Sequence, residues 1–116
     1  MAYVSGGTPA KYGTTETMAS VNDTAGHTGS VQGFAGHVVY QIVGTWAGTV
    51  TFRASNDGGT TVIDIMATNM VTDARVTTTT ANGMFRIDAT AVDDVYCEFT
   101  TDTSGTVEVV PTWAIG

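Results

Sequence analysis

The sequence has 116 residues and a net charge of −7, with 11 acidic residues against 4 lysines and arginines. Its length fits one small domain. Binding to a phosphate backbone needs clustered basic residues, so the composition argues against a nucleic-acid or anionic-membrane partner. No apolar run reaches the ~18 residues of a membrane span, and Met1 to Ala10 is too polar for a signal peptide. We therefore expect a soluble protein made in a cytoplasm.

Residues 1–33 differ in composition from the rest of the chain. They are rich in Gly, Thr and Ser and have few periodic apolar positions, which is typical of a flexible segment. We therefore expect an extended N-terminal arm over residues 1–33 and a folded domain over residues 34–116. A partner chain that grips this arm would order it, and packing on the chain's own body is the alternative.

The only side chains of the arm large enough to anchor it in the pockets of a partner are Tyr3, Val4, Tyr12 and Met18. We add two further candidates, Lys11 in the arm and Trp113, which lies near the C-terminus after Pro111. The predicted protein interface consists of Tyr3, Val4, Lys11, Tyr12, Met18 and Trp113.

Threonine makes up about a fifth of the residues and leucine is absent, a composition that favours β-strands. Alternating apolar residues predict strands over Val38 to Ile42 and Val50 to Ala54. Ser55 to Gly59 is the strongest turn signal in the chain, because Asn, Asp and Gly tolerate positive φ. It should lead into a strand over Thr60 to Ala67, followed by a loop or one helical turn over Thr68 to Ala74.

Two further hairpins are predicted in the C-terminal part of the chain. Ala81 to Gly83 is a second tight-turn signal, between a Thr-rich strand and an alternating strand that begins near Phe85. Asp102 to Gly105 should turn the strand around Cys97 into a last strand that ends at Pro111. Short strands with short connections favour an all-β, antiparallel β-sandwich, and both jelly-roll and immunoglobulin-like arrangements remain open.

The sequence lacks the signatures of catalysis. Cys97 is the only cysteine, which excludes an intrachain disulfide, and its alternating apolar setting is typical of a buried thiol. His27 and His37 have no third ligand at a zinc-like spacing. Neither a nucleophile elbow nor a phosphate-binding glycine loop is present. We expect no enzyme activity, no cofactor and no metal centre.

Acidic turns leave one alternative open. Asn56 and Asp57 in one turn, and Asp93, Asp94 and Asp102 further along, would supply oxygen ligands to calcium if their loops converged. Acidic turns that cap their own backbone explain the same residues.

Aromatic residues with a polar edge suit either a core or a binding surface. Trp46, at the start of a strand beside Gly44 and Gly48, is expected in the core or at its rim. If the domain bound sugars, Trp46, Tyr40, Tyr96 and Trp113 would be the candidates for an aromatic platform.

Two segments carry a resemblance to a known group of proteins. In residues 44–58 a strand rich in Gly, Thr and aromatics leads into a Ser-x-Asp-Gly hairpin, and in residues 77–88 a Thr-rich strand leads through a glycine turn to Phe-Arg-Ile-Asp. This pattern resembles small β-sandwich structural proteins of tailed bacteriophages. The match covers about a quarter of the chain at residue level, and the same order of elements extends over most of the folded domain.

The resemblance implies a virion component, and specifically a head decoration (cement) protein on the capsid exterior. Such a protein would bind the major capsid protein and copies of itself, often as a trimer, and would stabilise the head by bridging capsid subunits. The family pattern carries no catalytic residues to transfer. A tail or connector accessory subunit and a carbohydrate-binding module are the alternatives.

Overall fold

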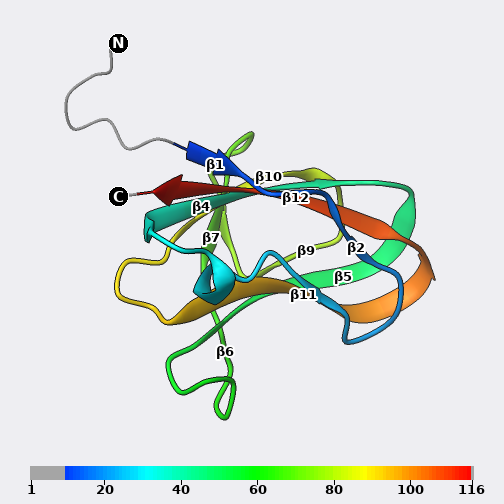
Figure 1. Cartoon of the computed structure of the whole chain (residues 1–116). Helices are drawn as coiled ribbons and strands as arrows, with labels where there is room; N and C mark the ends of the chain where they lie inside the picture. Colours follow the sequence, from blue (N-terminus) through cyan, green and yellow to red (C-terminus); the bar gives the residue numbers. More distant parts are fainter. Residues whose placement is uncertain (1–9, 116) are drawn as a thin grey trace.

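The computed structural model describes residues 10–115, which form two antiparallel β-sheets packed face to face (Figure 1). The seven-stranded sheet has the order β1 (Ala10–Tyr12), β12 (Val107–Ile115), β4 (Phe34–Val43), β10 (Gly83–Asp88), β7 (Ala67–Asn69) and β8 (Arg75–Val76), and β2 (Glu16–Met18) also pairs with β12. The five-stranded sheet has the order β3 (Thr24–Ala25), β11 (Asp94–Gly105), β5 (Trp46–Ser55) and β6 (Ile63–Asp64), and β9 (Thr78–Thr79) also pairs with β5. A short 3-10 helix, η1, covers Thr28–Ser30. The predicted antiparallel β-sandwich is confirmed.

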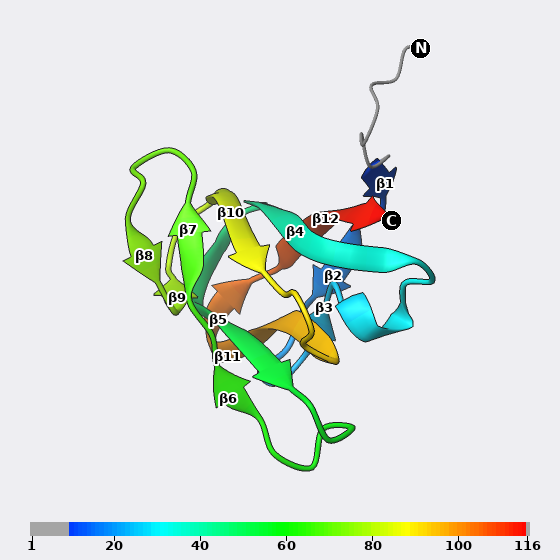
Figure 2. The same cartoon turned by 90° about the vertical axis from the view of Figure 1, so that its left-hand side faces the viewer.

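The core lies between the two sheets and follows the alternation in the sequence. In β4 the side chains of Val38, Tyr40 and Ile42 are fully buried, and in β5 the same holds for Val50 and Phe52. The intervening residues face outward, because successive side chains of a strand point to opposite faces. Figure 2 looks along the sandwich, with β8, β7, β10, β4, β12 and β1 across its upper part.

Cys97 is a free thiol buried in this core, as its sequence setting predicted. Burial raises the pKa of the thiol well above its usual value, and the nearby Glu16 carboxylate adds to the effect. A neutral buried thiol behaves as a small hydrophobic group, so Cys97 contributes to packing.

The described part of the segment expected to form an arm, residues 10–33, packs on the two sheets. β1 and β2 pair with β12, and β3 pairs with β11. Met18 and Ala25 are fully buried, and the Tyr40 hydroxyl donates to the Gly26 carbonyl at 2.7 Å. Residues 10–33 therefore supply part of the core of the sandwich. Residues 1–9 lie outside the described part of the chain.

Several connections cross from one sheet to the other where the sequence predicted hairpins or a continuous strand. The predicted strand Thr60 to Ala67 is divided into β6 in one sheet and β7 in the other. The predicted hairpin at Ala81 to Gly83 is wrong, because β9 pairs with β5 whereas β10 pairs with β4 and β7. The predicted hairpin at Asp102 to Gly105 is wrong for the same reason, since β11 and β12 belong to different sheets.

These crossing connections are held together at one end of the sandwich. The Asn82 side chain accepts a hydrogen bond from Trp46 Nε1 at 2.7 Å and donates one to the Gly44 carbonyl at 3.0 Å. Gly105 has a φ of +80°, and a Cβ there would collide with the Thr45 carbonyl of the neighbouring connection. Asn82 and Gly105 thus pack their connections against residues 44–46, which join β4 to β5, and do not close hairpins.

Pro111 was expected to end the last strand, but it lies in the middle of β12. A residue in an antiparallel strand directs its N–H and its carbonyl to the same side. The Pro111 carbonyl accepts a hydrogen bond from Gly13 N at 2.8 Å. The side of Pro111 that lacks an N–H therefore faces the gap between β1 and β2. The ladder of hydrogen bonds is interrupted there, so the proline is tolerated.

Candidate interaction surface

The predicted interface residues occupy very different environments. Tyr12, in β1, is 79% exposed, whereas Met18 has no exposed surface and lies in the core rather than on a surface that a partner can reach. Trp113 is also buried, with Gly13 packed against its ring. Lys11 pairs with Trp113 in the backbone register, and nothing of its side chain is described. Tyr3 and Val4 lie outside the described residues.

The aromatic platform considered for sugar binding does not form from the expected residues. Tyr40, Tyr96 and Trp113 are buried. Trp46 is half-buried, and its ring packs nearly perpendicular to the Phe99 ring at a centroid distance of 5.9 Å. Trp46 is therefore a rim residue, within the core-or-rim expectation.

His27 contacts both β3 and β11, and these contacts were not evident from the sequence. Its Nδ1 lies 2.7 Å from Asp94 Oδ2, and its Nε2 lies 2.9 Å from Thr24 Oγ1. Its ring stacks on Tyr96 at a centroid distance of 4.4 Å. Asp94 also accepts a hydrogen bond from Gly29 N at 3.0 Å. The group fastens the segment from β3 to η1 onto β11, so we assign it a structural role.

The acidic turns considered for calcium converge only in part. Asn56 Oδ1 accepts a hydrogen bond from Asp93 N at 2.7 Å, which joins two of the turns, whereas Asp102 pairs with Gly48 towards the other end of β11. Asp57 Oδ1 accepts hydrogen bonds from Thr61 N and the Ser55 hydroxyl. Among residues 10–115, no three His, Cys, Asp or Glu side chains are grouped so that they could hold a metal ion.

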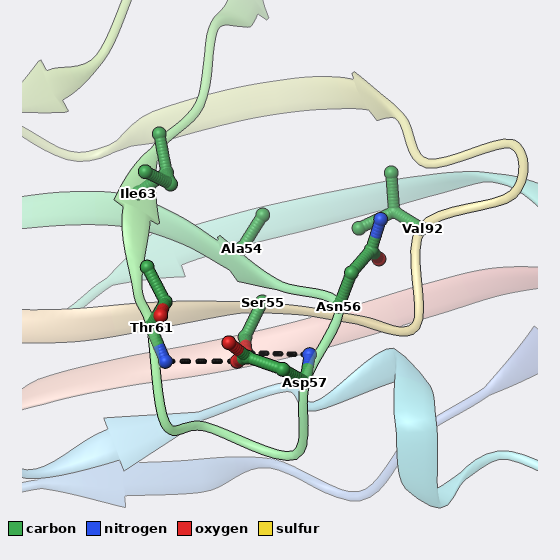
Figure 3. A pocket seen from close by; sticks show the side chains of 7 residues that line it. All are labelled: Ala54, Ser55, Asn56, Asp57, Thr61, Ile63 and Val92. Atoms are coloured by element: carbon green, nitrogen blue, oxygen red, sulfur yellow. Dashed lines mark hydrogen bonds between the residues drawn. The ribbon is translucent and has the colours of Figure 1, made fainter.

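A shallow pocket of about 380 Å³ opens beside this turn (Figure 3). It is lined by Ala54, Ser55, Asn56, Asp57, Thr61, Ile63 and Val92. The Asp57 carboxylate is directed at its own loop, and the Thr61 N–H holds its pKa below the usual value, with the Thr61 and Ser55 side chains contributing. Ser55, Asp57 and Thr61 bond one another and Asn56 bonds Asp93, so the pocket offers a ligand mainly the apolar Ile63 and Val92.

Exposed apolar side chains gather instead around the seven-stranded sheet. Seven large hydrophobic side chains are exposed among the described residues, and five of them belong to this sheet or adjoin β7. These five are Tyr12, Met66, Met70, Val71 and Met84. The Met70 N–H donates to the Met84 carbonyl at 2.9 Å, which places the two backbones side by side. Such a gathering of Met and Tyr is typical of protein–protein interfaces.

The strand register identifies the residues that share the outer face of this sheet. Arg86 lies between the buried Phe85 and Ile87, so its side chain points away from the core. Paired residues of neighbouring strands point to the same side. One row across the sheet therefore consists of Arg75, Thr68, Arg86, Val39, Thr112 and Tyr12. We call the surface formed by this row, by Met84 and by the adjoining Met66 and Met70 the outer face.

The two sheets and the connections that cross between them define a β-sandwich protein. Among the described residues, no helix is long and apolar enough to cross a membrane. No protein-family model and no curated protein sequence matches the chain.

Two solved structures share this fold. The SPBc2 prophage-derived protein YomS superposes with a TM-score of 0.72 at 19% sequence identity, over 91% of this chain and 95% of that chain. The PBSX exported protein XepA superposes with a TM-score of 0.69 at 17% identity, over 97% of this chain and 44% of that chain. The chain thus spans less than half the length of XepA. At these identities the likeness establishes the fold.

Proposed function

We propose that this chain is a structural protein of a bacteriophage particle, and specifically a capsid decoration protein. It binds the major capsid protein on the outside of the head and bridges neighbouring subunits, as a trimer of identical copies. It acts through binding, without a catalytic step or a cofactor.

The observation that carries this proposal is the outer face of the seven-stranded sheet. Tyr12 is 79% exposed there, and Met66, Met70 and Met84 extend the apolar surface across the sheet. An isolated domain gains nothing from leaving such side chains in water, whereas burying them against a partner is favourable. A lattice of identical sites multiplies modest contacts into firm attachment.

Two further observations support a place on the outside of a phage particle. The net charge of −7 suits a surface away from packaged DNA, whose phosphates would repel an acidic chain. One of the solved structures that share the fold, YomS, is a prophage-derived protein by name. A tail or connector accessory subunit fits the same observations and is the second candidate.

Co-sedimentation with purified heads and with purified tails of the phage that encodes the chain tests the proposal. We expect binding to heads, and we expect Tyr12→Ser and Met84→Ser each to weaken it about tenfold, as for central residues of an interface. Val21→Ser is the matched control, because Val21 is exposed but lies outside the seven-stranded sheet. Binding to tails alone would favour the second candidate. Binding to neither would overturn a structural role in the particle.

A further inference from the structure

A second pocket lies at the β7 end of the outer face and differs in character from the one beside β6. Its volume is about 400 Å³, and polar groups make up most of its lining. The residues around it are His37, Ile65, Met66, Thr68, Arg75, Arg86 and Asp88. Two of the four lysines and arginines of the chain therefore line one pocket in a protein of net charge −7.

The two arginines are placed on either side of one threonine. Thr68 pairs with Arg75 in β8 and with Arg86 in β10, so the three residues form one row across adjacent strands. Neighbouring strands are about 4.8 Å apart, which brings both guanidinium groups within reach of a group that sits over Thr68. The pocket thus combines two cations with a hydroxyl between them.

Neither arginine forms a salt bridge with an acidic group among the described residues. Asp88 is the only carboxylate in the lining of this pocket. Its Oδ1 accepts hydrogen bonds from the Thr90 hydroxyl at 2.7 Å and from Thr90 N at 3.1 Å. On the opposite sheet, by contrast, Arg53 lies 3.3 Å from Asp64 and 3.1 Å from Glu98. Arg53 is neutralised within the chain, and Arg75 and Arg86 are left for an external anion.

We propose that this pocket receives an aspartate or glutamate side chain from the protein on which the outer face docks. The inference rests on the proposed function and names the chemistry of the contact. Arginine matches a carboxylate with two parallel hydrogen bonds, and such pairs strengthen when apolar neighbours exclude water. Ile65 and Met66 supply these neighbours at the pocket itself. Protein–protein interfaces are enriched in Arg, Met and Tyr, and the outer face contains all three residue types.

Titration of the full chain with N-acetylglutamate, followed by NMR, tests the pocket without any partner. We expect saturable shifts of the Arg75 and Arg86 side-chain signals, and we expect Arg86→Gln to abolish them. The Arg53 signal should stay unchanged. Equal shifts with sodium chloride at the same ionic strength would overturn the inference. Tighter binding of galacturonate than of N-acetylglutamate would overturn the assignment to a protein side chain.

Co-sedimentation with phage heads tests the role of the pocket in docking. We expect Arg75→Gln and Arg86→Gln each to weaken binding about tenfold, and Arg86→Lys to recover only part of it because an ammonium lacks the planar fork. Arg53→Gln removes the same charge from the opposite sheet and should change binding less than about twofold. Urea midpoints of all variants verify folding.

The outcomes of the two experiments separate the inference from the proposed function. Heads that bind the chain and both glutamine variants equally would overturn the inference and leave the proposed function standing. If the unaltered chain binds neither heads nor tails, the proposed function falls, and the N-acetylglutamate titration alone decides whether the pocket takes a carboxylate.

Discussion

Replacing Tyr40 with phenylalanine removes one buried hydroxyl that joins three parts of the fold. Tyr40 lies in β4 and has no exposed surface. Its hydroxyl lies 2.7 Å from the Gly26 carbonyl and 3.0 Å from the Val95 carbonyl, which belong to the N-terminal segment and to β11. Burial is the main reason that its pKa lies well above the usual value, so the hydroxyl keeps its proton and donates at all ordinary pH values.

The magnitude of this effect follows from the two acceptors. The lost hydrogen bond contributes about 1 kcal/mol net, and a buried carbonyl left without a donor costs about 1–3 kcal/mol. The ring remains and leaves no large cavity, so we expect Tyr40→Phe to lower the free energy of unfolding by about 2 kcal/mol. At an m value of about 1.5 kcal/mol/M, the urea midpoint should fall by about 1.3 M.

Urea unfolding followed by tryptophan fluorescence measures this change. Tyr12→Phe is the matched control, because Tyr12 is exposed and its hydroxyl is open to water. Its loss should change the free energy of unfolding by no more than about 0.5 kcal/mol. If both variants unfold at the same urea concentration, the bridge from Tyr40 to the N-terminal segment does not stabilise the fold, and our account of how residues 10–33 are held is refuted.

Gly26→Ala should destabilise the fold by about 1–3 kcal/mol more than Gly58→Ala in urea unfolding, because both glycines have positive φ but only Gly26 faces a buried ring; equal losses would contradict this. Cys97 should react with a thiol reagent about 1,000-fold more slowly in the native protein than in denaturant at the same pH, and rapid native labelling would show that the thiol is accessible. Hydrogen bonds from the Thr90 hydroxyl and backbone lower the pKa of Asp88 in the folded state, so their stabilisation is present above the unfolded pKa and is lost as the pH falls through the folded value. Thr90→Val should therefore lower the urea midpoint more at pH 7 than at about pH 2.5, and an equal decrease at both pH values would argue against the shift.

The strands of the fold were predictable because their signal is local. A period of two places alternate side chains on one face, and this assigns Val38, Ile42, Val50 and Phe52 to the core before any pairing is known. The connections were not predictable, because a hairpin and a crossing between sheets use the same turn residues. Asn82 illustrates this, since its function depends on Trp46, which is distant in the sequence and close in space.

The interaction surface was only partly predictable from the sequence. Tyr12 was a candidate because it is a large side chain in a polar segment, and it is exposed. Met18 belongs to the same segment, yet it is buried because β2 pairs with β12 and places it against Val107. The row that joins Arg75 to Arg86 depends on the pairing of three strands, and single-strand patterns do not contain that information.

The position of the last two strands has a consequence for how the protein is made. β11 lies between β3 and β5. β12 lies between β4 on one side and both β1 and β2 on the other, so β11 and β12 occupy the interior of the two sheets. On the ribosome, the five-stranded sheet therefore cannot be completed until β11 has emerged, and the seven-stranded sheet cannot be completed until β12 has emerged. Folding dominated by such distant pairings takes milliseconds to seconds, which leaves time for chaperones to bind the unfinished chain.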